Sequence, residues 1–371
     1  MNACDGGVEL ILDEDGYYKS RINADKCIDC GRCLDICPYN TLPRQIDEVI
    51  SYVAYSKNRE DVINSSSGGI AYEIAKKYID KGYVVIGAAW SKDFGRVEHI
   101  SAFDGIDLLK LKKSKYVQSY TYDGFSQIKE AEKVVVFGTP CQIAGLRNLY
   151  GEREGLLLVD FDCMGPAGYN LWKKYLSYLD DLDATGIKSL EMRHKKHSWM
   201  RYGTLVEFND GQQYYKDKFH DPFCVLYHLA HTIQYPCLNE CKYKDSSMAD
   251  LRIGDAWNHV SGFTKSEIHD GLSLVTPLTE KGKSALTSIS DEIVLKEVKR
   301  TDNISLKITS DSRIVECLRN EESNIEDAIC IYNDVSLMRR LIRILSVVLS
   351  SNDFVYLSVK SLKKYVGGLL K

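Results

Sequence analysis

Long apolar runs are absent from this sequence. Nowhere in its 371 residues does a stretch reach the roughly 18 consecutive apolar residues that a membrane-spanning helix needs. The first residues, MNACDGGVELILDEDG, also lack the basic start and the apolar stretch of a secretory signal. We therefore expect a cytoplasmic protein.

A basic excess and a nicotinamide fingerprint are also absent. The formal net charge is −4 at pH 7, whereas general nucleic-acid-binding proteins are strongly basic. No G-x-G-x-x-G motif follows an apolar strand-like segment, as it does in proteins that bind NAD. These absences exclude nucleic acid as an expected partner and NADH as the expected electron donor.

Cysteine, by contrast, is plentiful, with 12 residues in the chain. Inside a reducing cell, clustered cysteines are typical of metal ligands or redox groups rather than of structural disulfides. Cys224, Cys317 and Cys330 stand apart from the other motifs, and we expect them to be small apolar core residues. The remaining cysteines lie near the N-terminus, at strand ends or in a later loop, so they need a chemical explanation.

Four cysteines near the N-terminus have the spacing of a bacterial-type ferredoxin. Cys27, Cys30, Cys33 and Cys37, with a proline after the last, form the run C-x2-C-x2-C-x3-C-P. Such a tight loop lets three thiolates converge on one cubane cluster, and Gly31 lets the backbone pass close to the sulfides. A zinc site would instead use two separated C-x2-C pairs. We therefore predict a 4Fe–4S cluster here.

The fourth ligand of this cluster has two candidates. In two-cluster ferredoxins the cysteine before the proline binds the other cluster, and this sequence holds one complete motif. Cys4, followed by a short apolar segment and an acidic turn at Gly16, looks like the end of a lost first motif. Either Cys4 completes the cluster and leaves Cys37 spare, or Cys37 closes the site locally. The spacing favours Cys4.

The middle of the chain predicts an α/β domain with a mainly parallel sheet. The expected elements are strands at 83–89, 133–139 and 156–160 and helices at 70–81 and 143–150. Cys141 and Cys163 follow two of these strands, at the carboxyl edge where such sheets bind ligands. Cys141 also stands at the start of a helix, a setting that lowers the pKa of a thiol.

A serine- and glycine-rich segment precedes the first of these helices, with the sequence SSSGG at 65–69. The serines can cap the helix, and the glycines expose backbone N–H groups at its positive end. This arrangement suits a phosphate or the edge of a flavin ring. An ordinary helix cap explains the same residues, so both interpretations stand.

The third region contains a probable hairpin at 203–216, a C-x3-C pair and a strand that ends at Asp255. Cys237 and Cys241 form the pair, and two cysteines this close in a cytosolic loop usually share a metal. A redox dithiol is the alternative, although C-x3-C is not the thioredoxin spacing. The histidines in this region are scattered, and we expect surface or core roles for them: His194, His197, His220, His228 and His231.

Together these segments resemble the beta subunit of coenzyme F-420 hydrogenase/dehydrogenase. The resemblance rests on SSSGG, KYVQS at 115–119, GTPCQIAGLR at 138–147, the strand end at Cys163 and the C-x3-C segment before IGDAW, and it covers about residues 20–290. More narrowly, it looks like the ferredoxin-fused branch found in polysaccharide biosynthesis gene clusters. In that family an FAD lies in the α/β core beside a 4Fe–4S cluster, and electrons pass to or from a deazaflavin, a ferredoxin or another acceptor.

The resemblance implies a second cluster and a flavin site. The family's cluster ligands match Cys141, Cys163, Cys237 and Cys241. Its flavin-contacting segments match Ser66, Ser67, Gly68, Gly69, Lys115, Tyr116, Gln118, Ser119, Thr139 and Gln142. One departure is that the family has C-x2-C where this sequence has C-x3-C, and the extra residue displaces Cys237. The loop either still holds the cluster, more loosely, or has lost it.

We expect a ferredoxin-like N-terminal domain, an α/β flavin-binding domain with a mixed sheet, and a helical C-terminal tail. The expected boundaries are 1–45 for the ferredoxin-type domain, 46–62 for a linker, 63–160 for the flavin domain, 161–300 for the domain with the cluster-binding cysteines, and 301–371 for the basic tail. Residues 337–349 of the tail are apolar with arginines. Such a helix can lie on the inner face of an anionic membrane, cover the chain's own core or contact a partner.

The sequence therefore predicts an oxidoreductase that depends on FAD and 4Fe–4S clusters and whose substrate is unknown. It would relay electrons from ferredoxin or a reduced deazaflavin coenzyme through its clusters to FAD and the substrate, in polysaccharide biosynthesis. The alternative is a non-catalytic electron-transfer subunit of a larger redox complex. Flavin in the purified protein would distinguish the two.

Overall fold

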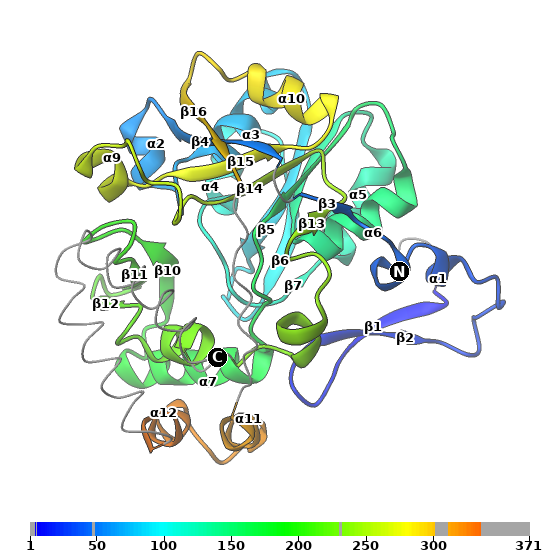
Figure 1. Cartoon of the computed structure of the whole chain (residues 1–371). Coiled ribbons are helices and arrows are strands. Elements are labelled where there is room, and N and C mark those ends of the chain that lie inside the picture. The colour runs from blue at the N-terminus through cyan, green and yellow to red at the C-terminus, as the bar shows by residue number, and fades with distance from the viewer. Residues whose placement is uncertain (1–3, 5, 47–48, 230–231, 301–310, 335–371) are drawn as a thin grey trace, which may run out of the picture.

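A mixed sheet forms the centre of the computed structural model (Figure 1). The structure describes residues 4, 6–46, 49–229, 232–300 and 311–334, and within these ranges the central sheet has nine strands. In sheet order, the strands are β16 (Ile293–Lys299), β4 (Ile50–Ser56), β15 (Ser273–Pro277), β14 (Leu251–Asp255), β9 (Leu156–Phe161), β8 (Val134–Gly138), β5 (Val84–Trp90), β6 (Val97–Ala102) and β7 (Ser119–Tyr120).

The middle of this sheet is parallel, as the sequence predicted for these strands. β5, β8, β9 and β14 pair in parallel, whereas β15, β4 and β16 continue the sheet antiparallel on one side, and β6 pairs antiparallel with β5 on the other. β8 (VVVFG) and β9 (LLLVDF) are apolar and buried along almost their whole length, as strands covered on both faces must be. Their carboxyl ends meet at one edge of the sheet, and Cys141 and Cys163 follow there.

Helices cover both faces of the sheet. The helices that pack on one face are α3 (Ile70–Asp80), α4 (Gly105–Leu111) and α10 (Glu280–Thr287), and those on the other face are α5 (Tyr122–Glu130) and α6 (Pro140–Tyr150). Alternation along the strands produces the two faces. Val135 and Leu157 belong to the first core, and their neighbours Val134 and Leu156 belong to the second.

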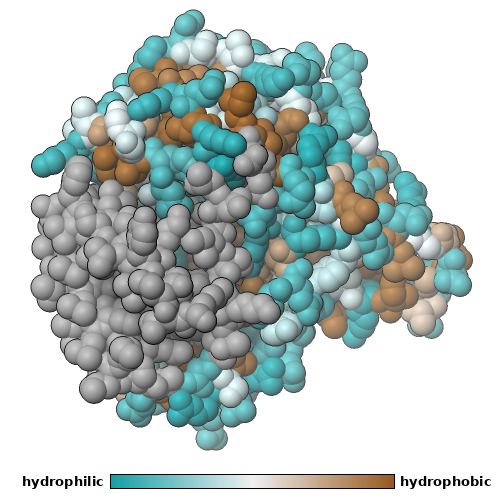
Figure 2. Space-filling model, viewed as in Figure 1, coloured by the Kyte–Doolittle hydropathy of each residue, from teal (hydrophilic) through white to brown (hydrophobic). Residues whose placement is uncertain are grey.

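The N-terminal segment lies beside the sheet, at the right of Figure 1. Its elements are β1 (Val8–Leu12), β2 (Tyr18–Ile22), α1 (Arg32–Asp35), a 3₁₀ turn (Pro38–Asn40) and β3 (Arg44–Gln45), which pairs with β13 (Ser246–Ser247). Figure 2 shows hydrophobic side chains at the surface on this side. Ile28, Leu34 and Leu42 are 83%, 63% and 92% exposed, so this segment buries little apolar surface of its own.

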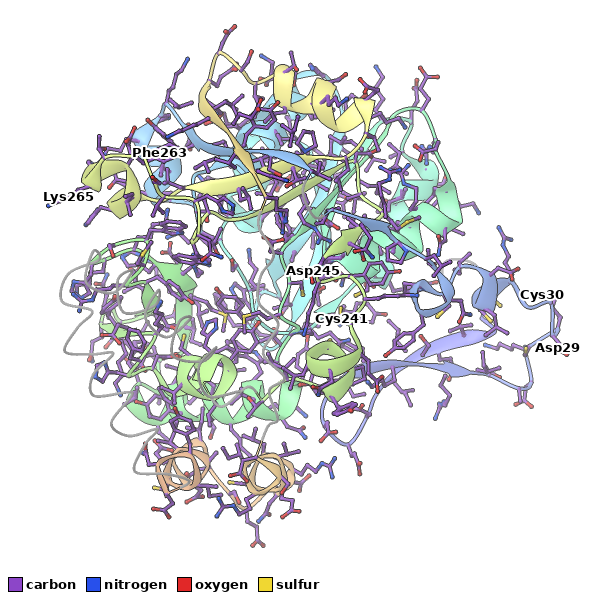
Figure 3. The ribbon with its side chains drawn as sticks, in the orientation of Figure 1. Asp29, Cys30, Cys241, Asp245, Phe263 and Lys265 are labelled. Carbon is purple, nitrogen blue, oxygen red and sulfur yellow. The ribbon has the colours of Figure 1, made fainter. Side chains whose placement is uncertain are left out.

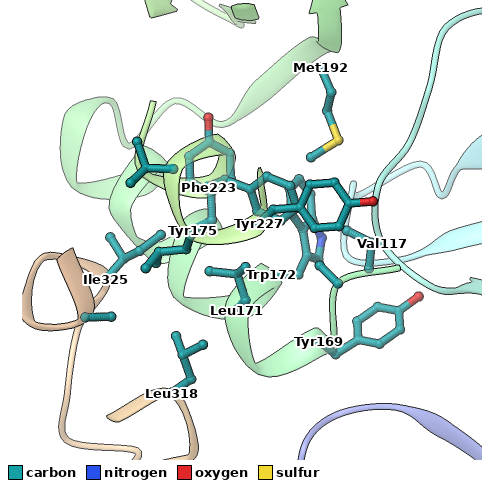
Figure 4. Packing of buried hydrophobic residues seen from close by; sticks show 14 of the residues in the cluster. Val117, Tyr169, Leu171, Trp172, Tyr175, Met192, Phe223, Tyr227, Leu318 and Ile325 are labelled. Atoms are coloured by element: carbon teal, nitrogen blue, oxygen red, sulfur yellow. The ribbon is translucent and has the colours of Figure 1, made fainter. Parts of the chain in front are cut away.

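A second group of elements lies below the sheet in Figure 1 and packs around an aromatic core, which Figure 4 shows from close by. Its elements are α7 (Tyr169–Leu182), β10 (Ile187–His194), β11 (Gly203–Phe208), β12 (Gln213–Asp217), α8 (Pro222–Cys224), π-helical turns at Val225–Leu229 and Pro236–Glu240, α11 (Ser312–Arg319) and α12 (Ile325–Asp334). Trp172 and Tyr175 of α7 pack against Phe223 in this core. Leu318 and Ile325 join the same cluster, so residues 311–334 cover the chain's own core.

The observed architecture differs from the expected boundaries at two points. The segment 46–62, expected to be a linker, contains β4 and the start of α2 (Arg59–Ile63). Val53 and Ala54 of β4 are fully buried, so the strand pairs inside the sheet despite its polar neighbours. The expected boundary between 160 and 161 falls within β9, which pairs with β14 from the later region. One continuous sheet therefore joins the two expected domains.

Two other expectations concern the C-terminal part. Cys224 and Cys317 are buried as predicted, whereas Cys330 is exposed, because it lies on the solvent side of α12 while Ala328 and Tyr332 are buried. The expected membrane-surface segment at 337–349 lies outside the described residues. No helix within the described ranges is long and apolar enough to span a membrane. One further helix, α9 (Lys265–Asp270), is short and polar.

Candidate iron–sulfur centres and cofactor site

The N-terminal cysteine motif forms an exposed loop. Asp29 and Gly31 have positive φ angles of 51° and 71°, so the chain doubles back between the cysteines. The N–H of Asp29 donates to Sγ of Cys27 at 3.4 Å, the kind of bond that stabilises a thiolate. Cys27 and Cys30 are exposed, and Figure 3 places Cys30 at the outer end of the N-terminal segment. A centre held here would be accessible to an external partner.

Cys4 lies beside this loop. A side-chain carbon placed on Gly7 would stand 2.6 Å from Sγ of Cys4 and 3.7 Å from Cα of Cys27. The glycine at this position therefore leaves the space that the Cys4 thiol uses. This contact places Cys4, one of the two candidates for the fourth ligand, next to the first cysteine of the motif.

Cys141 and Cys163 lie where the sequence placed them, after β8 and β9. Cys141 is in the first turn of α6, and its Sγ is 3.4 Å from Oγ1 of Thr139. Cys163 follows β9 and accepts a hydrogen bond from the N–H of Gly165 at 3.3 Å. Gly165 in turn touches Cys237, because a side-chain carbon on this glycine would lie 2.6 Å from Cβ of Cys237. Segments far apart in the sequence thus bring their thiols to one edge of the sheet.

The extra residue between Cys237 and Cys241 has a structural explanation. Residues Pro236–Glu240 form a π-helical turn, in which the backbone bonds span one residue more than in an α-helix. A π-helical turn therefore absorbs one inserted residue without changing where the helix leads. In Figure 3, Cys241 lies close to the middle of the molecule, in the loop after this turn. The C-x3-C spacing keeps both thiols at the sheet edge.

These thiols also interact electrostatically. Burial raises the pKa of Cys163 well above its usual value, and neighbouring negative charge at Cys141, Cys237 and Cys241 would raise it further. Burial likewise raises the pKa of Cys237 to about 12, with Cys141 and Cys241 adding to the effect. The sequence predicted a lowered pKa for Cys141 at its helix start. That prediction has the wrong direction, because desolvation by the surrounding protein raises the pKa of this thiol, although the residue as a whole is exposed.

The chemistry of both cysteine groups fits iron–sulfur clusters, which are held by thiolates. As placed, the side chains of the described residues do not bring three His, Cys, Asp or Glu groups close enough to share one metal ion. The groups are therefore neighbours without being a closed ligand shell. Hydrogen bonds from Asp29 and Gly165 already point at two of the sulfurs. The ligand sets belong to the proposed function below.

A buried ion pair supports the loop that carries Cys241. Asp160 of β9 and Arg252 of β14 are both fully buried, and the guanidinium binds the carboxylate through two bonds of 2.8 and 2.7 Å. Arg252 also donates to the carbonyl oxygens of Tyr243, Lys244 and Ser246. The pair thus fixes the chain directly after Cys241 to the sheet. Sequence reasoning missed both residues, although a charge inside an apolar strand was the available signal.

The SSSGG segment forms a tight turn before α3. Gly69 caps the helix with a φ of 86°, and no serine side chain caps it, contrary to the expectation. Gly68 lies against β4 and β15, because a side-chain carbon there would stand 2.3 Å from the carbonyl oxygen of Ala54. Its N–H donates to Oγ of Ser273 at 2.9 Å. The glycines are thus required by close backbone packing.

Asp255 organises the surroundings of this turn. Its carboxylate accepts hydrogen bonds from Ser67, from Trp199 at 2.9 Å, and from Arg193 at 2.9 and 3.0 Å. Burial opposes the charge of Asp255, but the Arg193 guanidinium holds its pKa below the usual range. Arg193 also donates to the carbonyl oxygen of Ser66, and its Nε is buried without a hydrogen-bond partner among the described residues. This unpaired donor is the one feature here that fits an additional polar ligand.

The remaining residues expected at a flavin are largely bonded to protein groups. Lys115 donates to the carbonyl oxygens of residues 110, 112 and 113 at the end of α4, and burial lowers its pKa to about 7. Gln118 bonds the backbone of Tyr18 in β2. The ring of Tyr116 packs against the ring of Tyr227, with their centroids 4.8 Å apart and their planes tilted by 32°. Ser119, Thr139 and Gln142 are linked to one another by hydrogen bonds at the start of α6.

In comparisons with known proteins, each of the two cysteine-containing regions matches a family model. Residues 19–42 match the family model of the 4Fe-4S binding domain, and residues 131–303 match that of the C terminus of the coenzyme F420 hydrogenase/dehydrogenase beta subunit. The coenzyme F420-dependent sulfite reductase of Methanocaldococcus jannaschii is 22% identical over 340 residues, which cover 77% of this chain and 50% of that protein. The chain thus spans about half the length of this curated relative.

A solved structure is also similar at low identity. The F420-reducing NiFe hydrogenase complex from Methanosarcina barkeri, in a xenon derivative, aligns with a TM-score of 0.48 and 18% identity, over 80% of this chain and 94% of that one. The matched family segments contain Cys27, Cys30, Cys33 and Cys37 in the first region, and the four cysteines at the sheet edge in the second. The chain therefore carries a 4Fe–4S binding domain and, over residues 131–303, a region related to the beta subunits of coenzyme F420 hydrogenases and dehydrogenases.

Proposed function

We propose that this protein is an iron–sulfur flavoprotein oxidoreductase that relays electrons through two 4Fe–4S clusters to FAD and a substrate. One observation carries the proposal. Cys141 and Cys163 follow the neighbouring strands β8 and β9, and Cys237 contacts Gly165, whose N–H donates to Cys163, so thiols from three separate segments lie near one edge of the sheet. Four thiols are the donor set of a cubane cluster. Packing alone does not require thiols from three segments at one edge.

The N-terminal cluster would be held by Cys27, Cys30, Cys33 and Cys4. Cys4 is preferred to Cys37 as the fourth ligand because it lies beside Cys27. The exposure of Cys27 and Cys30 suits the entry of electrons from an external donor. Cys37 would then be a spare thiol between the two centres.

A flavin would lie against the SSSGG turn and the start of α6. The buried Nε of Arg193 supplies a donor for a polar group of the ligand. Tyr116 borders the same region, since Arg193 donates to its hydroxyl at 3.4 Å, and Lys115 and Gln118 flank Tyr116 in the segment before β7. When bound, FAD supplies two-electron chemistry that the clusters, as one-electron centres, do not. The protein's own part is to hold its residues in place and to exclude water.

A deazaflavin coenzyme or a ferredoxin is the proposed electron donor. The deazaflavin is supported by the name of the relative from Methanocaldococcus jannaschii, which depends on coenzyme F420. A role in polysaccharide biosynthesis, on a sugar-linked or lipid-linked substrate, rests on the family resemblance alone. A peripheral position at the inner membrane face would depend on the tail, which lies outside the described residues. Reduction by purified F420 or ferredoxin, with NADH as the negative control, tests the donor.

The experiment that tests the proposal is cofactor analysis of protein purified without oxygen. Wild-type protein should contain two clusters and one flavin per chain. Cys141→Ser should remove one cluster and keep the ferredoxin-type signal, and Cys30→Ser should do the reverse. Cys330→Ser is the matched control, because its thiol is exposed and remote from both groups. If Cys141→Ser retained all the iron, the second cluster would not exist.

A non-catalytic electron-transfer subunit is the second candidate. The observation that favours it is that Ser67, Lys115 and Gln118 already bond protein groups where a flavin was expected. Such a subunit would hold both clusters but no flavin. The same purified sample decides, because full cluster occupancy without flavin would support this candidate and flavin would exclude it.

A further inference from the structure

The segment after Cys37 is fastened to the segment after Cys241. β3 pairs with β13, and the N–H of Ile46 donates to the carbonyl oxygen of Asp245 at 3.1 Å. Ile46 is fully buried, so this contact is packed as well as hydrogen-bonded. Two chain segments that begin at cysteines of the two different groups therefore run side by side.

Two side chains clamp this contact at its start. Lys242 donates to the carbonyl oxygens of Tyr39, at 2.6 Å, and Thr41. The Tyr243 hydroxyl donates to the carbonyl oxygen of Pro38 at 2.7 Å. Lys242 and Tyr243 directly follow Cys241, and their acceptors follow Cys37 within a few residues. The clamp thus joins the two cysteine-bearing turns and not distant parts of the two regions.

The helix that carries Cys141 in its first turn, α6, contacts the same segment. Nδ2 of Asn148 in α6 donates to the carbonyl oxygen of Ile36 at 3.2 Å and also bonds Oγ1 of Thr41. Gly145, one turn earlier, lies close to the N-terminal segment, since a side-chain carbon there would be in ordinary van der Waals contact with Cδ of Pro38, at 3.9 Å. The N-terminal segment is therefore held by both the α6 segment and the Cys241 loop.

We propose that this contact, formed by residues 36–46 with Asn148, Lys242 and Tyr243, is the path by which electrons pass from the N-terminal cysteine group to the group at the sheet edge. The inference rests on the proposed function, and it adds the residues that set the separation of the two centres. Each transfer would move one electron, so that a cluster held by the N-terminal cysteines would be oxidised and a cluster held by the sheet-edge cysteines would be reduced. No covalent bond forms or breaks, and no proton is needed.

The alternatives within the described part of the chain are less direct. Gln118 joins β2 to the turn before β7, and Arg319 pairs with Asp15 at the surface, far along the hairpin from Cys27. Lys19 of β2 donates to Gln234, beside the turn of Cys237, but Lys19 precedes the N-terminal cysteine motif by eight positions. The clamp is distinguished from these contacts because its donors and acceptors follow ligand candidates of both groups within a few residues.

The test combines Lys242→Met with Tyr243→Phe in the full chain with its cofactors. These changes keep the side-chain volumes and remove the hydrogen bonds across the contact. Lys174→Met is the matched control, because Lys174 also donates to two backbone carbonyls, of Asn320 and Ser323, but far from either cysteine group. The iron content of the double variant and of the control should equal that of wild type.

Hydrogen exchange and the rate of inter-cluster reduction measure the effect of the clamp, and the spin–spin interaction measures the distance between the two centres. Hydrogen exchange at the Ile46 amide should become about tenfold faster in the double variant, because charge-assisted and neutral hydrogen bonds of the clamp are lost. Reduction of the sheet-edge cluster through the N-terminal cluster should slow by up to about tenfold, the limit being reached where loss of the bonds makes the undocked arrangement dominant. The spin–spin interaction between the two reduced clusters should weaken in the electron paramagnetic resonance spectrum. Lys174→Met should match wild type in all three measurements.

The outcomes separate this inference from the proposed function. Wild-type protein with a single cluster would overturn the proposed function and this inference with it. Two clusters with unchanged inter-cluster transfer in the double variant would overturn the inference alone, even if the Ile46 amide exchanged faster. If the double variant did not fold, Asn148→Ala, which removes the α6 side of the contact, takes its place with the same expected changes.

Discussion

The N-terminal cysteines and the cysteines at the sheet edge are assembled in opposite ways. Cys27 and Cys30 lie in one short, exposed loop whose shape depends on local backbone angles. Cys163 and Cys237 lie in segments more than seventy positions apart and meet only after the parallel strands have paired. Burial raises the pKa of both of these thiols. A cluster at the N-terminal loop needs little of the fold, whereas one at the sheet edge needs nearly all of it.

This difference determines which substitutions should affect each centre. Changes in the N-terminal loop should act locally and leave the sheet intact. Changes to buried groups that hold the Cys241 loop should affect both the sheet-edge centre and the stability of the whole chain. The following substitutions test this comparison.

The choice between Cys4 and Cys37 has the largest expected effect. Cys4→Ser should remove the N-terminal cluster, and Cys37→Ser should retain it, because Cys4 lies beside Cys27 while Cys37 precedes the clamp. Iron analysis and electron paramagnetic resonance spectra of both variants measure this, with Cys330→Ser as the control. Loss of the cluster in Cys37→Ser but not in Cys4→Ser would show that the motif closes on its own.

A substitution of Arg252 tests whether the sheet-edge centre depends on the buried Arg252–Asp160 ion pair. Arg252→Met leaves the Asp160 carboxylate buried without its partner, which costs about 3–5 kcal/mol. The Cys241 loop also loses the bonds from Arg252 to three carbonyl oxygens. Chemical denaturation should show the lowered stability, and iron analysis should show partial loss of the sheet-edge cluster. Arg313→Met, which removes an exposed arginine paired with Asp311, should change neither.

The buried imidazole of His99 makes the stability of the central sheet depend on pH. Its Nε2 lies 3.1 Å from the carbonyl oxygen of Phe137, and burial lowers the pKa of the imidazole from 6.5 to about 4. Between these two values the unfolded chain binds more protons than the folded chain. The free energy of unfolding should therefore fall as the pH falls through this window, by at most about 3 kcal/mol.

His99→Gln should reduce this pH dependence, since glutamine does not titrate. Denaturant unfolding at pH values of about 7 and 5 measures the difference between the two proteins. An equal pH dependence in wild type and His99→Gln would show that His99 does not contribute to it.

The fold was predictable where patterns are local. β8, β9 and α6 follow from apolar runs and a helix start, and the structure confirms them. β4 was missed because its serines and tyrosines resemble a polar linker, although it pairs with β15 and β16, two strands from much later in the sequence. The expected boundary after residue 160 falls inside β9, which pairs with β14 from much later in the sequence. Pairing between distant segments leaves no local signal.

In the candidate site too, only the features with a local sequence pattern were predictable. Cysteine spacing and the family resemblance located the thiols, but not Arg252, Arg193 or Lys242, whose partners lie far away in the sequence. The direction expected for the pKa shift of Cys141 was wrong, because the desolvation that raises this pKa comes from protein groups that surround the thiol only in the folded chain. The π-helical turn that accommodates the extra residue before Cys241 was likewise visible only in three dimensions.

Asp29 tests the local character of the N-terminal loop and has the smallest expected effect. Its φ of 51° is tolerated by aspartate but disfavoured for a β-branched residue. Asp29→Val should therefore destabilise the loop by about 1–2 kcal/mol, whereas Asp29→Gly should not. The rate at which a chelator removes iron from the N-terminal cluster should rise in the valine variant, and the sheet-edge cluster should be unaffected. Asp25→Val is the control, because Asp25 is exposed and precedes the loop. A loss of both clusters in Asp29→Val would contradict the independence of the two centres.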